Sequence, residues 1–374
     1  MKKNGLIFLG VLAIFMAGCS KDTPEVQAKP DPDAWMYDVS LPVPIRFGSS
    51  ELDTRAAIED MSDMVDQRFA FIAVNKNADN LNEPDDIDFP DNARAKYVGV
   101  GSEEGKFVFM TPKNSAEEMV YYYPVNTDEC YSFYGYHSEE TKNNVDPDTV
   151  PPIAREEDVV AVEIGVAVKE DILWGKAEAE AEIASNGYMY DGFNAAYIRK
   201  IQKTPCVEFI HPATCLRFTL TRKENRVSSN LIVSHAYLDS IPSKARLCLY
   251  DLARDKMGQF TDVIETNDVE IAKGVALTTN VGKKLDDLFI MPQTEPLKLR
   301  LVFALPNSTT GMSMTYELDP NDYPAIGPEG FLAGHRYNFN LIVWDPVKVE
   351  ITASVKGYDD AFVNDPIDPD LMGK

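Results

Sequence analysis

The chain has 374 residues, with 36 basic and 60 acidic side chains and a formal net charge of −24 at pH 7. So acidic a protein repels nucleic acids and anionic lipid head groups, and no basic cluster offsets this, which excludes both as charge-driven ligands. The length suits two domains better than one. The five cysteines form no C-x-x-C pair, so the sequence does not indicate a disulfide-stapled fold.

The first 18 residues have the form of an export signal, with two lysines before an apolar stretch that is too short to span a bilayer. The stretch ends in Met-Ala-Gly directly before Cys19, which resembles a bacterial lipobox. This resemblance implies that Cys19 becomes the lipidated N-terminus; the alternative is an ordinary signal peptide with an incidental cysteine. Residues 19–38 are rich in proline and charge, and we expect a tether with little to bury.

Short strands with period-two alternation dominate the first half of the mature chain. Val43, Ile45 and Phe47 alternate with other residues and predict a first strand, which a polar loop containing Arg55 follows. Further strands are predicted at 69–74, 97–100, 106–110, 119–123, 131–136 and 159–168. The turn between 100 and 106 predicts a hairpin. Only 56–66 and 176–185 have a composition that favours longer helices.

The stretch 186–204 breaks this pattern, because it contains two glycines and a short helical segment at 193–198. We therefore predict an N-terminal domain at 39–190 and a C-terminal domain at 200–374. Strands of the second domain are predicted at 207–210, 216–221, 236–238, 246–250, 297–305, 312–318, 336–344 and 347–355. Many short strands with turn signals predict an all-β fold of β-sandwiches, and the absence of long βαβ periodicity argues against a parallel sheet.

Motifs for catalysis are missing from the sequence. The chain has four histidines and neither G-x-S-x-G, H-E-x-x-H nor a phosphate-binding loop. Cys206, His211 and Cys215 are spaced like metal ligands, but they lie in what reads as two strands and a corner, which favours a structural histidine. The acidic stretches 84–88 and 365–370 lack the form of a calcium loop and favour solvated loops. We predict no enzyme, no metal and no cofactor.

Five stretches, in this order over nearly the whole mature chain, together resemble the fimbrillin family, the subunits of type V pili of anaerobic Gram-negative bacteria. They are 45–47 with 54–56, 171–177, 207–211 with 216–220, 289–293 and 334–339. The resemblance implies two tandem transthyretin-like β-sandwich domains. It also implies a location on the outer membrane and cell surface as part of a fimbrium, with other pilus subunits as partners.

The resemblance further implies processing. An arginine-specific, trypsin-like protease would cut after Arg55, so that the product begins at Ala56 and has lost both the lipid anchor and a removable strand at 43–47. The loss of a strand exposes backbone groups and an apolar trough that invite another strand. The candidate donor strand, which equally fits as the closing strand of the chain's own sandwich, contains Val347, Val349, Ile351, Ala353 and Val355. The proline- and acid-rich segment 364–370 is a poor donor.

Two functions of different classes follow. The first is a pilus subunit, either of the stalk or a minor or tip adhesive subunit, that loses residues before Ala56 and assembles by strand exchange. The second is a lipid-anchored surface protein that binds a glycan or host ligand, keeps residues 19–55 and does not polymerise. A surface hydrolase is a third class, which would need a nucleophile–base site or a carboxylate pair among the 60 acidic residues, and the scarcity of other catalytic signals disfavours it.

Overall fold

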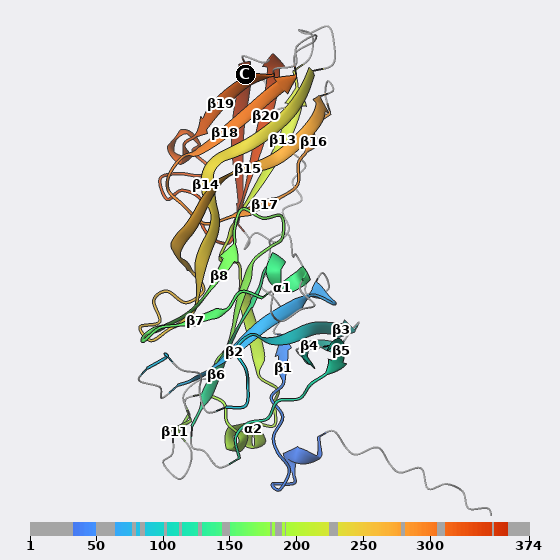
Figure 1. Cartoon of the computed structure of the whole chain (residues 1–374), viewed down its shortest axis with the longest axis vertical. Helices are drawn as coiled ribbons and strands as arrows, with labels where there is room; N and C mark the ends of the chain where they lie inside the picture. Colours follow the sequence, from blue (N-terminus) through green and yellow to red (C-terminus); the bar gives the residue numbers. More distant parts are fainter. Residues whose placement is uncertain are drawn as a thin grey trace, which may run out of the picture.

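The structure is a computed structural model of the whole chain. It describes residues 33–49, 64–76, 80–82, 87–100, 103–111, 114–125, 129–143, 150–179, 182–183, 189–190, 192–223, 231–277, 281–304, 311–345 and 348–357. In Figure 1, the N-terminal strands form the lower half of the molecule and the C-terminal strands the upper half. Among the described residues, no helix is both long and apolar enough to cross a membrane.

Strands make up most of the described chain, which confirms the predicted all-β class. The strands are β1 (Phe47–Ser49), β2 (Arg68–Asn75), β3 (Ala93–Val100), β4 (Glu103–Thr111), β5 (Asn114–Glu118), β6 (Tyr131–His137), β7 (Ile153–Arg155), β8 (Val159–Gly165), β9 (Leu173–Ala177), β10 (Glu182–Ile183), β11 (Met189–Tyr190), β12 (Cys206–Ile210), β13 (Thr214–Arg222), β14 (Leu231–Asp251), β15 (Phe260–Leu277), β16 (Lys283–Lys284), β17 (Leu288–Ile290), β18 (Leu297–Ala304), β19 (Met312–Leu318), β20 (His335–Asp345) and β21 (Lys348–Gly357). The helices are a 3-10 turn at Ala34–Met36, α1 (Glu139–Asn143), α2 (Ala195–Ile201) and a 3-10 turn at Pro320–Asp322.

The lower half is a sheet that closes on itself. Its strands follow the order β1-β12-β9-β6-β2-β3-β4-β5, and β1 also pairs with β4, so that all of these strands except β5 form a closed ring. Alternate side chains of these strands point inward and form an aromatic core, which we call the ring core; Phe69, Phe71, Phe107, Phe109 and Phe133 are among its members. The predicted hairpin at 97–110 is confirmed as β3 and β4.

The outward faces of β2, β6 and β9 pack on the upper half of the molecule. Their residues form a second core together with β8, the lower part of β14, and Phe289. Strand β14 is 21 residues long and pairs with β18 along its first part and with β8 along its last part. One strand therefore contributes both to the core of the upper half and to the second core, where the two halves meet (Figure 1).

The upper half is a sandwich of two sheets. One sheet has the order β16-β13-β20-β21, with β17 also paired to β13, and the other contains β19, β18, β14 and β15. Leu216, Phe218, Leu299, Phe303 and Phe339 are among the buried residues between them. Strand β21 is the last strand of its sheet within the described residues, and it pairs with β20 over its whole length.

Strands cross the boundary that we expected near 190–200. Strand β8, from the first half of the sequence, pairs with β14 of the upper half, and β12, from the second half, pairs with β9 and β1 of the ring. Within residues 33–38, which we expected to belong to the tether, Trp35 is buried in the ring core.

Several local expectations differ from the structure in kind or in extent. Within the predicted helix at 176–185, residues 176–177 lie in strand β9 and residues 182–183 in β10, and no described residue is helical. The predicted strand at 119–123 is reduced to a single bridge between Tyr122 and Pro44. The predicted strands at 236–238 and 246–250 are parts of one strand, β14. The short helix expected at 193–198 is confirmed as α2, which lies two to three residues further along the chain.

Candidate functional site: the strand that closes the ring

Residues 43–49 fill the seam between β4 and β12. Phe47 is opposite Phe107 of β4, and Gly48 is opposite Cys206 of β12. Before β1, the Ile45 amide donates to the carbonyl oxygen of Tyr121 at 2.8 Å, and the Tyr123 amide donates to Val43 at 3.0 Å. Removing this segment would leave backbone groups of β4, β12 and the 121–123 segment without these partners, and unpaired edges of that kind accept another strand.

The three residues predicted to be a removable strand all point into the ring core. Val43, Ile45 and Phe47 are 1%, 2% and 1% exposed. The Phe47 ring lies 4.9 Å from the Phe133 ring and 5.3 Å from the Phe71 ring, between centroids. Full burial of such side chains stabilises by about 1.5–3 kcal/mol each. The segment is thus a major part of the ring core, although it is short and comes from one end of the chain.

The segment just before the seam is held on α2. Trp35 is 7% exposed and belongs to the ring core. The Arg199 guanidinium of α2 donates to the carbonyl oxygens of Leu41, Val39 and Trp35 at 2.5, 3.3 and 3.4 Å. Sequence reasoning missed both residues, because a lone tryptophan in a charged, proline-rich stretch and an arginine in a short helix carry no periodic signal.

The lipidation and cleavage residues lie outside the described residues. Cys19, Arg55 and Ala56 therefore stay predictions from the sequence. The other nearby arginine, Arg46, is described: its guanidinium donates to an Asp33 carboxylate oxygen at 2.7 Å, and its side chain is 42% exposed.

The candidate donor or closing strand is paired within its own chain. Val349, Ile351, Ala353 and Val355 are half-buried on one face of β21 and pack against the core of the upper sandwich. The residues between them are exposed. Val347 lies outside the described residues. In this structure the strand closes its own sandwich, and its second edge has no strand partner among the described residues.

The cysteines and histidine that were spaced like metal ligands do not converge. Cys206 is exposed at the start of β12, whereas Cys215 is buried in β13. His211 is buried beside Asp171, with 3.1 Å between its Nδ1 and a carboxylate oxygen. Within the described part of the chain, no group of three or more histidine, cysteine, aspartate or glutamate side chains is arranged to hold a metal ion. Burial raises the pKa of the free Cys215 thiol to about 12, which is typical of an unreactive structural cysteine.

A buried charge cluster lies on the outer side of the ring. The ammonium group of Lys76 is 3.5 Å from a carboxylate oxygen of Glu178, which also accepts a hydrogen bond from the Tyr134 hydroxyl. Burial raises the pKa of Glu178, but this hydrogen bond and the charge of Lys76 outweigh it and hold the pKa below its ordinary value. The three groups satisfy one another, which indicates a structural cluster and not a reactive one.

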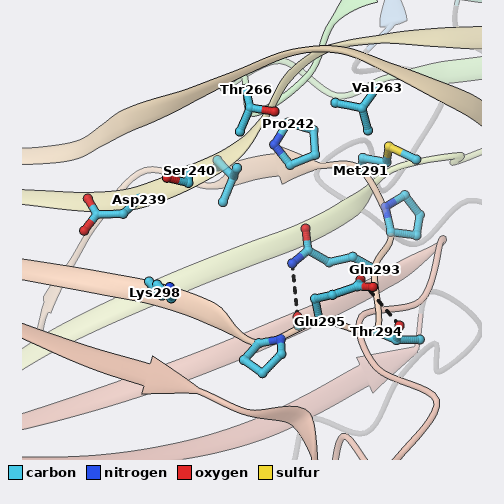
Figure 2. A pocket seen from close by; sticks show the side chains of 13 residues that line it. Asp239, Ser240, Pro242, Val263, Thr266, Met291, Gln293, Thr294, Glu295 and Lys298 are labelled. Atoms are coloured by element: carbon cyan, nitrogen blue, oxygen red, sulfur yellow. Dashed lines mark hydrogen bonds between the residues drawn. The ribbon is translucent and has the colours of Figure 1, made fainter.

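A depression of about 700 Å³ lies where β14 and β15 bend, beside the 291–296 segment. Figure 2 shows Pro242, Val263 and Met291 on one side of it, with Asp239 and Lys298 at the opposite end. Its lining combines apolar side chains with polar and charged ones, as ligand sites commonly do. The Glu295 carbonyl oxygen accepts a hydrogen bond from the Gln293 amide at 3.1 Å.

No protein-family model matches the chain, and no curated protein matches it. The chain is similar in structure to a proposed cell adhesion protein from Bacteroides uniformis, with 14% identity over 84% of this chain and 98% of that one and a TM-score of 0.49. It is also similar to a fimbrial assembly protein from Parabacteroides distasonis, with 10% identity, 85% and 99% coverage and a TM-score of 0.43. A third is the tip fimbrial protein Mfa3 from Porphyromonas gingivalis with a C-terminal truncation, with 10% identity, 85% and 100% coverage and a TM-score of 0.39. The chain thus resembles fimbrial and cell adhesion proteins.

Proposed function

We propose that the protein is a subunit or adhesin of a cell-surface pilus, exported as a lipoprotein and activated by removal of its ring-closing segment. Cutting after Arg55 would leave a product of 374 − 55 = 319 residues that begins at Ala56. The lost part would include the lipid on Cys19 and the whole of 33–49. A strand from another pilus subunit would then occupy the opened seam.

The observation that carries this proposal is the position of residues 43–49. They form the only connection between β4 and β12 in the described part of the ring, and three of their side chains are in its core. A segment that is required for closure, yet lies at the start of the fold, is a part that one cut can detach. Interior strands such as β2 or β6 are joined to the fold at both ends and do not have this property.

The C-terminal strand β21 and the residues after it favour one position in the pilus over the others. Because β21 closes its own sandwich and 364–370 contains prolines and acids, we favour a minor or tip subunit over a stalk subunit. The processed subunit would accept a strand at its seam and donate none.

The test is limited digestion of the purified mature protein with a trypsin-like protease. We expect a clean product whose N-terminus is Ala56, and Arg55→Gln should abolish that cut. Incubation of the product should give defined complexes with another subunit, whereas long ladders of the protein alone would identify a stalk subunit. An uncut Arg55 in the folded protein would contradict the proposal.

The second candidate function is a lipid-anchored surface protein that binds a glycan or host ligand and never polymerises. The depression at the bend of β14 and β15 favours it, because a binding protein needs a concave site with polar groups on the rim. This function predicts that residues 19–55 remain on the mature protein. Substitution of Gln293, whose side chain lies in the depression, would then weaken binding on a glycan array.

A further inference from the structure

Helix α2 holds Arg199 at a fixed place beside the seam. Asn194 caps the helix by accepting a hydrogen bond from the Tyr197 amide at 2.8 Å. Ile198 is 2% exposed and packs in the ring core, so the helix is anchored to the body of the ring. A few residues later the chain enters β12, the strand that pairs with β1.

The hydrogen bonds from the Arg199 side chain to the N-terminal segment all go to backbone carbonyl oxygens of that segment. Its short bond goes to Leu41, and the two longer bonds go to Val39 and Trp35, so one planar cation spans the whole turn from 35 to 41. The charge of Arg199 also helps to lower the pKa of Asp38, after the hydrogen bonds from Ser40 to that carboxylate. A cation in this place satisfies carbonyl groups that no strand in the described residues pairs with.

A cut within residues 50–63 breaks a covalent link but removes none of these contacts. Trp35, Val43, Ile45 and Phe47 stay in the ring core, β1 stays paired on both sides, and the Arg199 hydrogen bonds stay in place. Arg46 and Asp33 add an ion pair within the segment itself, which keeps its two halves together. The cut segment therefore has to dissociate as a bound peptide does.

We propose that Arg199 is a positioning residue that retains segment 33–49 on the ring after the cut, so that cleavage and release are separate steps. The inference rests on the proposed function for its biological setting, since a retained segment matters only where it is to be replaced. The seam then stays covered until an incoming strand competes for it or the segment leaves. A nicked subunit would be stored in this state without exposing its apolar core.

The test uses the full mature chain without lipid, with a site for a sequence-specific protease placed within 50–63. Nicking is then independent of Arg55, so a failure of the natural cleavage and a failure of retention give different results. Release is followed by native mass spectrometry and by the fluorescence of Trp35, with Trp174→Phe and Trp344→Phe in the background. The nicked protein is diluted, and an excess of segment peptide with Trp35→Phe, which differs in mass and lacks the fluorophore, is added to prevent rebinding.

We expect the nicked protein to keep its segment, and Arg199→Gln to speed release by about tenfold or more, the factor that corresponds to the loss of hydrogen bonds from a charged donor. Arg199→Lys keeps the charge but not the planar fork, so its release rate should lie between the two. Lys203→Gln is the matched control, since Lys203 is exposed just after α2 and the structure gives it no hydrogen bond or ion pair with a described residue.

Two results would overturn the inference. One is loss of the segment from the nicked protein within the mixing time. The other is an equal release rate for Arg199→Gln and Lys203→Gln. Melting of the uncut variants shows whether each one folds, and if Arg199→Gln does not fold, the comparison of Arg199→Lys with Lys203→Gln decides in the same way.

Discussion

Substitution of Phe47 by alanine tests whether the ring depends on its first strand. The Phe47 side chain is 1% exposed and its ring contacts those of Phe71, Phe109 and Phe133, with centroids 4.9 to 5.7 Å apart. Truncation of a buried phenylalanine costs about 3–5 kcal/mol, because the transfer free energy is lost and a cavity remains. Since 1.4 kcal/mol is about a tenfold change, the folding equilibrium of the ring should weaken by about 10² to 10⁴.

The assay is urea unfolding of the uncut mature chain, followed by near-ultraviolet circular dichroism of the aromatic ring core. Val39→Ala is the matched control, because Val39 lies in the same segment but is 78% exposed, and its truncation should cost less than about 0.5 kcal/mol. The reasoning also requires that the processed chain, once it has released this segment, unfolds identically whether it was prepared from the wild type or from Phe47→Ala. A cost below about 1 kcal/mol in the uncut chain would refute the closing role of the strand.

The remaining predictions concern the buried groups. The fold lowers the pKa of Glu178 from its ordinary value of 4.5. The ionised carboxylate therefore contributes its full stabilisation above pH 4.5, and this contribution is lost as the pH falls through the pKa of the folded state. The difference in melting temperature between the wild type and Glu178→Gln should accordingly shrink below pH 4.5 and stay constant above it. Burial raises the thiol pKa values of Cys215 and Cys248 to about 12, whereas Cys206 is exposed. Of these three cysteines, only Cys206 should therefore be alkylated in the native protein at pH 8, and peptide mass mapping would show which thiol has reacted. Rapid alkylation of either buried thiol would mean that the fold opens locally.

The elements that the sequence predicted well are those with at least one buried face. Residues 69–74, 131–136 and 207–210 alternate or run apolar because one or both of their faces lie in a core, and β2, β6 and β12 confirm them. The inward set at 43–47 has the same origin. The parallel pairing of β1 with β12 does not, since the residues of β12 are more than 150 positions away and no local pattern specifies the partner.

Strand β15 shows what local patterns cannot reveal. Most of its side chains are exposed, because it is an edge strand that pairs with β14 alone in the described residues. With little to bury, its sequence carries hardly any alternation, and no strand was predicted there. The predicted helix at 176–185 is the opposite case, in which a local pattern was present but did not decide the structure. An alanine- and glutamate-rich composition favours a helix only weakly, and the pairing of β9 with β6 and β12 overrides that preference.

In the candidate site, the apolar inward residues could be predicted and the polar contacts could not. Three side chains at alternate positions define a buried strand face, which the sequence displays directly. The Arg199 hydrogen bonds go to backbone carbonyl oxygens more than 150 residues away, and a carbonyl oxygen has no residue-specific signature. Contacts of this kind become visible only when the chain is folded.

Strand β14 has a mechanical consequence. Because it is hydrogen-bonded to β18 in one half of the molecule and to β8 in the other, a pull along the long axis loads both sets of bonds in shear, where many must break together. A linker of a few residues would instead let the two halves swing and then stretch. Since β15 is also paired alongside β14 from Leu231 to Leu247, we expect the two halves to resist swinging against each other under tension.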